Sequence, residues 1–235
     1  PHFWLANTIF SRPGETVLDP FCGSGTVLVE SALSGRNALG ADSNPLARLI
    51  TRVKTTPIDP GILEKALLDL RWRLSDDLRS APPDVVNIAH WFHPHVIKQL
   101  VCLNHAIRSI GDEQVREFFL VCFSRCVRRV SLADPRLSVP VRLRTDQYSD
   151  GHWLKEKTVS LINRLKKINV YKEFFSLAEA NVLRMKSLSS LLASGVKARV
   201  PYDNARNLKE FDASINKSRK LKDGSVDFIV SSPPY

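Results

Sequence analysis

Within the first 42 residues, two short apolar runs lie on either side of one segment with a helical pattern. Short apolar runs in residues 15–21, ETVLDPF, and residues 37–42, NALGAD, predict two strands. The segment between them, VLVESALSGR, predicts a helix that ends at Gly35. One compact face of this helix consists of Val27, Leu28, Ser31 and Ala32. Strand, helix and strand in this order predict an α/β unit.

The middle of the chain follows a helical period instead. Two apolar stripes are separated by Gly111 and Asp112, which predict a helix stop and a helix start. The stripes are Val96, Leu100, Leu103, Ile107 and Ile110, then Val115, Phe118, Phe119, Cys122, Phe123, Cys126, Val127 and Val130. Further helical periodicity runs through residues 154–192. The two cysteines of the second stripe are therefore expected in the core.

Strand patterns return after the helices, in KARVPYDNARNL and in VDFIVSSPPY. The whole pattern predicts an α/β fold, a partial Rossmann-like sheet with a large helical insertion. We expect a first part of the sheet domain in residues 1–59, the insertion in residues 60–195 and a second part in residues 196–235.

Composition is that of a globular protein, with 43% hydrophobic and 25% charged residues in a chain of 235. Neither a signal-peptide pattern nor an apolar run of transmembrane length is evident. We therefore expect a cytoplasmic protein that does not bind a membrane. The cysteines lack disulfide-scaffold spacing and are expected to be reduced: they are Cys22, Cys102, Cys122 and Cys126.

Positive charge is concentrated in one part of the chain. The net charge is +10, and residues 125–167 hold eleven Lys or Arg against four acids. Such a surface suits a phosphate backbone, although a solvated helix face is the alternative. The candidate phosphate contacts are Arg125, Arg128, Arg129, Arg136, Arg142 and Arg144.

A glycine turn between the first strand and its helix points to a cofactor. In FCGSGT, Gly23 and Gly25 let a ligand approach the main chain, because they lack a Cβ. Asp42 follows Gly23 by 19 residues at the tip of the next strand, where a carboxylate binds ribose hydroxyls. The turn lacks the third glycine of a dinucleotide site, which disfavours NAD. The three histidines of HWFHPH suggest a zinc site. No second ligand cluster follows at finger-like spacing, so we expect no metal.

The segment VLDPFCGSGTVLVESALSGRNALGADSNPLA closely resembles the cofactor motifs of S-adenosylmethionine-dependent DNA amino-methyltransferases, and SPPY resembles their catalytic motif. The similarity covers residues 13–59 and 200–235, with weaker likeness in WFHP and RRVSLADPR. It implies a methyltransferase sheet and S-adenosyl-L-methionine. The family usually has Gly-Asp-Ala-Arg where this chain has DNAR, which puts Asn204 in the place of the acid that contacts adenine. The implied cofactor residues are Asp19, Pro20, Phe21, Cys22, Gly23, Gly25, Thr26, Asp42, Ser43 and Asn204.

The implied catalytic residues are Ser232, Pro233, Pro234 and Tyr235. An oxygen of Ser232 and the Pro233 carbonyl would accept hydrogen bonds from the amine of a base, and Tyr235 would stack on that base after it leaves the duplex. Serine at the first position goes mostly with cytosine N4 methylation in this family, and N6-adenine methylation stays open. The implied partner is double-stranded DNA, in a restriction-modification system, with the six arginines as DNA contacts.

Other functions remain open from the sequence. They are an RNA or protein amino-methyltransferase, a small-molecule enzyme with a nucleotide cofactor, and an inactive DNA-binding remnant. The family's sheet has three more strands after the catalytic motif, so we expect a fragment that is inactive by itself. The missing strands would come from a longer product or from a second polypeptide.

Overall fold

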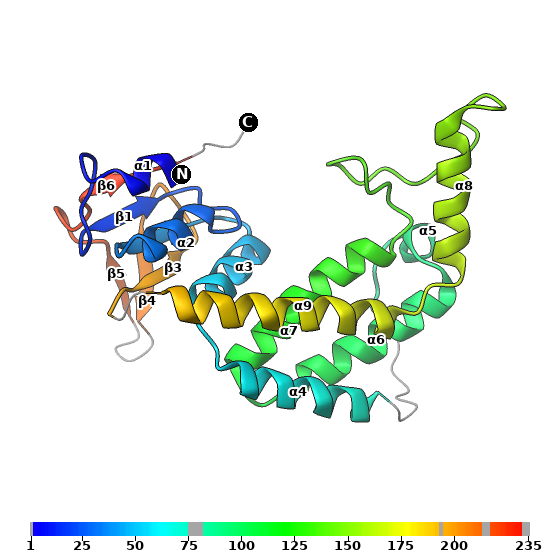
Figure 1. Ribbon diagram of the computed structural model, residues 1–235, viewed down its shortest axis with the longest axis horizontal. Helices are drawn as coiled ribbons and strands as arrows, with labels where there is room; N and C mark the ends of the chain where they lie inside the picture. The colour runs from blue at the N-terminus through cyan, green and yellow to red at the C-terminus, as the bar shows by residue number, and fades with distance from the viewer. Residues whose placement is uncertain (1, 75–81, 193–194, 213–216, 232–235) are drawn as a thin grey trace. The chain divides into compact units, whose positions relative to one another are not determined.

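The computed structural model describes residues 2–74, 82–192, 195–212 and 217–231 (Figure 1). Contacts divide the chain into two compact units, Pro1–Pro60 with Leu183–Tyr235, and Gly61–Val182. The first is called the sheet unit, because it contains the parallel sheet, and the second is called the helical unit.

The sheet of the sheet unit has four described strands in the order β3-β2-β1-β6, and every neighbouring pair is parallel. The strands are β1 (Thr16–Asp19), β2 (Asn37–Ala41), β3 (Ala198–Tyr202) and β6 (Phe228–Ile229). In the register, Val17 lies opposite both Ala38 and Phe228. Parallel neighbours joined through helices are typical of an α/β fold, so the expected partial Rossmann-like sheet is confirmed.

Three helices of the sheet unit come from the first 55 residues: α1 (His2–Ala6), α2 (Thr26–Leu33) and α3 (Pro45–Thr55). The buried residues of α2 are the four that its pattern predicted. Asn44 caps α3 by accepting a hydrogen bond from Leu46 N, and Pro45 occupies the first turn, where a missing N–H costs nothing. The core that these elements share contains Leu5, Val17, Cys22, Val27, Leu28, Ala38 and Val200.

The helical unit is built from six helices of the described chain, of which α4, α6 and α7 each bury an apolar stripe. They are α4 (Pro60–Arg73), α5 (Ile88–Trp91), α6 (Pro94–Arg108), α7 (Glu113–Val130), α8 (Trp153–Lys166) and the larger part of α9 (Val170–Leu191). Asp112 caps α7 by accepting from Val115 N at 3.0 Å, as its position after Gly111 predicted. Both predicted stripes face the interior, with Ile110, Phe123 and Val127 only partly buried.

Several elements differ from the sequence-based expectation. The first strand ends at Asp19 rather than at Phe21, because Phe21 N turns back to the Asp19 side chain. A separate antiparallel hairpin, β4 (Lys209–Asp212) with β5 (Lys217–Lys220), was not predicted. None of the helices that the structure describes is long and apolar enough to span a membrane.

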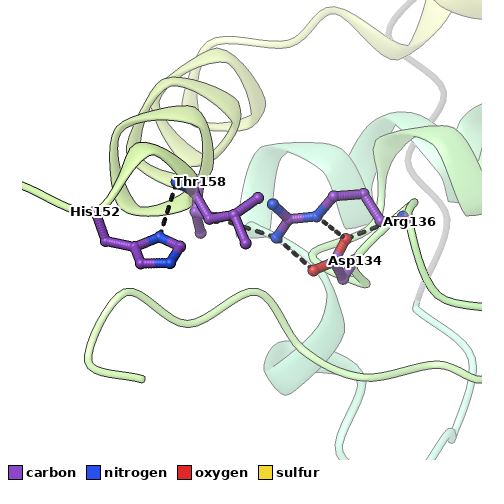
Figure 2. Close-up of polar contacts among 5 residues, drawn as sticks. Asp134, Arg136, His152 and Thr158 are labelled. Carbon is purple, nitrogen blue, oxygen red and sulfur yellow. Dashed lines mark hydrogen bonds and ion pairs between the residues drawn. The ribbon is translucent and has the colours of Figure 1, made fainter. Parts of the chain in front are cut away.

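An ion pair anchors the segment that follows α7 (Figure 2). The Arg136 guanidinium donates to both carboxylate oxygens of Asp134, at 2.8 and 2.6 Å, and to Thr158 Oγ1 on α8 at 3.1 Å. The side chain of Asp134 is only 6% exposed, and Thr158 is fully buried. Because of the hydrogen bonds from Arg136, the pKa of Asp134 is held below its usual value.

Replacing Arg136 with alanine should destabilise the helical unit by about 1–3 kcal/mol, since the buried carboxylate of Asp134 loses its partner. The matched control is Arg144→Ala, which removes an exposed pair with Asp146 and should change stability little. Because the Asp134 pKa is lowered on folding, its contribution is present above about pH 4 and is lost as the pH falls through the folded pKa. Urea unfolding at several pH values measures both effects, and equal losses in the two variants would contradict the structural role of Arg136.

Candidate functional site

The carboxyl ends of the four parallel strands meet at one edge of the sheet. The glycine turn follows β1, Asp42 follows β2, Asn204 lies just after β3, and Ser231 lies just after β6. The chain passes from β1 to β2 on one side of β1, and β6 pairs on its other side. In open α/β sheets such a switch in strand order is where ligands bind, outside the carboxyl ends.

Two glycines with positive φ shape the turn after β1, Gly23 at 51° and Gly25 at 79°. The turn is closed by Gly25 N donating to Cys22 O at 2.8 Å, and it is joined to β2 by Cys22 N donating to Ala41 O at 2.9 Å. A Cβ on Gly25 would lie 2.7 Å from side-chain atoms of the buried Thr51. A Cβ on Gly23 would meet nothing within 4 Å, so the main chain there is open to a ligand.

The carboxylate of Asp42 connects this turn to the end of β2. Its Oδ2 accepts from Gly23 N at 2.9 Å, and its Oδ1 accepts from Asn44 N at 2.8 Å. The Asp42 backbone is held as well, by Tyr202 O and by the Arg48 guanidinium. Each carboxylate oxygen keeps a further lone pair, and the side chain is half-buried, so this group can still accept hydrogen bonds from two neighbouring hydroxyls.

Two residues of α3 donate hydrogen bonds to carbonyl groups of the turn, and neither was predicted from the sequence. Thr51 Oγ1 donates to Gly23 O at 3.0 Å, and Lys54 Nζ donates to Ser24 O at 2.9 Å. Burial lowers the pKa of Lys54. The only signal in the sequence was their spacing of three residues, which puts them on one side of a helix.

Asp19 is the buried acid of the site, with 3% of its surface exposed. Its Oδ1 accepts from Phe21 N and from Ser231 Oγ, both at 3.1 Å, so it joins the ends of β1 and β6. Burial raises the pKa of this carboxyl. Burial likewise raises the pKa of the Cys22 thiol to about 11, which keeps it protonated and unreactive near neutral pH.

The other expected cofactor residues lie around the same edge. Pro20 and the half-exposed Phe21 are in the turn, and Thr26 begins α2 with its side chain exposed. Ser43 is exposed beside Asp42. The Asn204 side chain accepts from Arg206 N at 3.0 Å, which shapes the turn after β3.

The expected catalytic residues lie outside the residues that the structure describes: they are Ser232, Pro233, Pro234 and Tyr235. The described chain reaches Ser231, one residue before them. Their roles therefore stay predictions.

All six arginines are exposed residues of the helical unit, but they differ in their partners. Arg129 pairs with Glu173, Arg136 with Asp134 and Arg144 with Asp146. Arg128 donates to Leu137 O at 2.7 Å, and Arg142 lies 3.5 Å from His90 Nδ1. Three of the predicted phosphate contacts thus already neutralise a carboxylate, which leaves Arg125, Arg128 and Arg142 without an acidic partner among the described residues.

Metal-binding side chains do not gather in the described part of the chain: no three of His, Cys, Asp or Glu are placed to hold an ion there. Of the HWFHPH histidines, His93 and His95 stack at 5.9 Å between ring centroids, and His95 Nε2 lies 3.2 Å from Ile168 O.

Comparison with known proteins relates this site to methyltransferases. Residues 8–51 match the family model of N6/N4-type enzymes described as DNA methylase. The chain is 28% identical over 230 residues to the type II methyltransferase M.MvaI of Kocuria varians, which covers 94% of the chain and 46% of the relative. It is 44% identical over 57 residues to the type II methyltransferase M.MjaII of Methanocaldococcus jannaschii, which covers 24% of the chain and 11% of that relative. No solved structure gives a significant match.

The resemblance to DNA amino-methyltransferases is therefore confirmed, and the family model covers the glycine turn and Asp42. The chain spans about half the length of M.MvaI. Neither relative supports a second polypeptide as partner.

Changing Gly25 to alanine should destabilise the sheet unit by about 2–4 kcal/mol, because it adds a clash with Thr51 to the strain of a positive φ. Gly14→Ala is the matched control: its φ is 91°, yet a Cβ there would meet nothing within 4 Å, so only the backbone strain of about 1–2 kcal/mol applies. Thermal unfolding compares the two variants. Equal losses would mean that α3 does not close the turn in the way described.

Proposed function

We propose that the chain is the cofactor-binding and DNA-contacting part of an S-adenosylmethionine-dependent DNA amino-methyltransferase. The observation that carries this proposal is the Asp42 carboxylate, which accepts a hydrogen bond from Gly23 N and so joins the glycine turn to the end of the neighbouring strand. It presents oxygen acceptors beside a stretch of main chain that no Cβ covers. A ribose and an adjoining charged tail fit that pair of features.

The residues at the sheet edge fit this cofactor one by one. Asp42 would accept the two ribose hydroxyls, and the main chain at Gly23 and Gly25 would line the methionine end. Asn204 would face the adenine, although its Oδ1 is engaged with Arg206 N, which leaves its Nδ2 as the available donor. When bound, the cofactor supplies a methyl group on a positively charged sulfur. The protein has to hold that group and bring an amine in line with it.

The SPPY segment would orient the amine. Ser232 and the Pro233 carbonyl would accept its N–H hydrogen bonds and aim the nitrogen lone pair, which is otherwise delocalised into the base. Prolines offer no competing N–H and hold the carbonyl rigid. Ser231 Oγ, bonded to the buried Asp19, supports this role because it ties the residue before the motif to the end of β1.

The proposed target is N4 of cytosine, and the alternative is N6 of adenine. Serine at position 232 favours cytosine through the resemblance alone. The proposed location of the protein is the cytoplasm, which is consistent with a DNA substrate. The positive charge of residues 125–167 supports a nucleic-acid substrate over a small molecule.

Asp42→Asn should weaken binding of S-adenosylmethionine by about 1–3 kcal/mol, since charge-assisted hydrogen bonds to the ribose are lost. Glu15→Gln is the control, because Glu15 directly precedes β1 and therefore lies at the opposite, amino edge of the sheet. Isothermal titration calorimetry measures both, with the melting temperature as a check on folding. Unchanged affinity in Asp42→Asn would remove the basis of the proposed cofactor site.

The reaction product tests the choice of base. DNA treated with the protein and cofactor, digested to nucleosides and analysed by mass spectrometry, should contain N4-methylcytosine. The assay should use the full-length product of the gene. Ser232→Ala with Tyr235→Ala should abolish the product and leave cofactor affinity nearly unchanged, because both side chains act on the base alone. N6-methyladenine as the product would show that the assigned base is wrong.

A further inference from the structure

A short loop of the helical unit has a buried base and a fully exposed tip. It is called the 134–142 finger after its residues, and it lies between α7 and α8, where Figure 1 shows part of the chain reaching away from the helices of its own unit. Residues 131–134 and Leu143 at its base are buried, whereas every residue from 135 to 142 is exposed. An antiparallel bridge between Ala133 and Arg142 closes the base.

The finger is held in one conformation by several contacts. Asp134 N donates to Val141 O at 2.7 Å, and Leu143 N donates to Leu132 O at 2.8 Å across the base. Arg136 is fixed on Asp134 and Thr158, and Arg128 of α7 donates to the Leu137 carbonyl. Pro135 and Pro140 restrict the backbone further. The loop therefore loses little conformational entropy when it meets a partner.

The exposed part of this loop carries three apolar side chains, beside Arg136, Ser138 and Arg142. Leu137 is 42% exposed, Val139 61% and Val141 42%. Scattered exposed apolar residues are ordinary, but Leu137 and Val139 lie two residues apart on a pinned projection and form a small apolar tip, with Val141 nearer its base.

The surroundings of the tip are positively charged. Residues 125–144 contain six arginines and a single acid, Asp134, which Arg136 neutralises. Arg128 contacts the finger at the Leu137 carbonyl, Arg142 is its last residue, and neither has an acidic partner among the described residues. A complementary partner would place negative charge against the arginines and an apolar surface against Leu137 and Val139. Duplex DNA has this order, with phosphates outside and stacked bases inside a groove.

We propose that the 134–142 finger inserts Leu137 and Val139 between bases of the DNA duplex, while Arg128 and Arg142 contact the flanking phosphates. The inference rests on the proposed function, because an enzyme that acts on an exocyclic amine has to extrude its base from the duplex. An apolar wedge lowers the cost of that step by filling the space where a base step is unstacked. Insertion of Leu137 and Val139 into the duplex does not itself require bound cofactor.

The test compares binding of two duplexes by the full chain, one perfectly paired and one with a single central mismatch. Because the mismatch is already partly unstacked, the wild-type protein should bind it roughly tenfold more tightly. Leu137→Ser with Val139→Ser should remove this preference and leave the salt dependence of binding unchanged. Arg142→Ala should keep the preference and lower the log–log salt slope by about 0.9, the value for one lost phosphate contact. Val159→Ser, which changes an exposed valine of α8, is the control and should behave as the wild type.

Fluorescence anisotropy at several salt concentrations measures all these quantities, and circular dichroism checks that each variant is folded. A preference that survives in the Leu137, Val139 double variant would overturn the wedge and leave the proposed function intact. A wild-type chain that binds neither duplex nor cofactor would overturn both. Binding to vesicles of phosphatidylserine and phosphatidylcholine that depends on Leu137 and Val139, without a mismatch preference on DNA, would instead make the finger a membrane contact and refute the inference.

Discussion

The hydrogen bonds of the Asp42 carboxylate are the constraint on which the sheet edge depends. They connect the turn after β1 to the end of β2, with one oxygen on Gly23 N and the other on Asn44 N. Since Asn44 caps α3, and α3 carries Thr51 and Lys54 back to the carbonyls of Gly23 and Ser24, a closed circuit of contacts surrounds the turn. A turn that needs positive φ at two residues is held in place by this circuit rather than by apolar packing alone.

Arginines in the helical unit serve two different purposes, and the structure separates them. Arg136 belongs to a buried network with Asp134 and Thr158, so its guanidinium fixes the fold of the segment after α7. Arg128 and Arg142 are exposed on the surface, and Arg128 also donates a hydrogen bond to the Leu137 carbonyl of that segment. The same cluster of charge thus supplies both the rigidity of the 134–142 finger and the positive field around it. A count of basic residues in the sequence does not distinguish the structural arginine from those exposed on the surface.

Several features followed from sequence patterns, because local rules determine them. The buried face of α2, the cap of α7 and the glycines at the two positive-φ positions of the turn each depend on neighbours in the chain. Contacts between distant residues left no pattern: Thr51 reaches Gly23 across 28 residues, and Ser231 reaches Asp19 across 212. The hairpin of β4 and β5 was missed because its sequences, KEFD and KSRK, lack an alternating apolar face. The pairing of Arg136 with Asp134 required knowing that Asp134 is buried.

Hydrogen exchange of the full chain, with and without S-adenosylhomocysteine as an analogue of the cofactor, tests the location of the cofactor site most directly. We expect slower exchange of amides in residues 21–26 and 42–46, because the ligand would cover the turn that Asp42 holds and stabilise its hydrogen bonds. Amides of α6, in the helical unit, should exchange at an unchanged rate. Protection confined to the helical unit, or no protection at the glycine turn under saturating ligand, would contradict the assignment of this edge as the cofactor site.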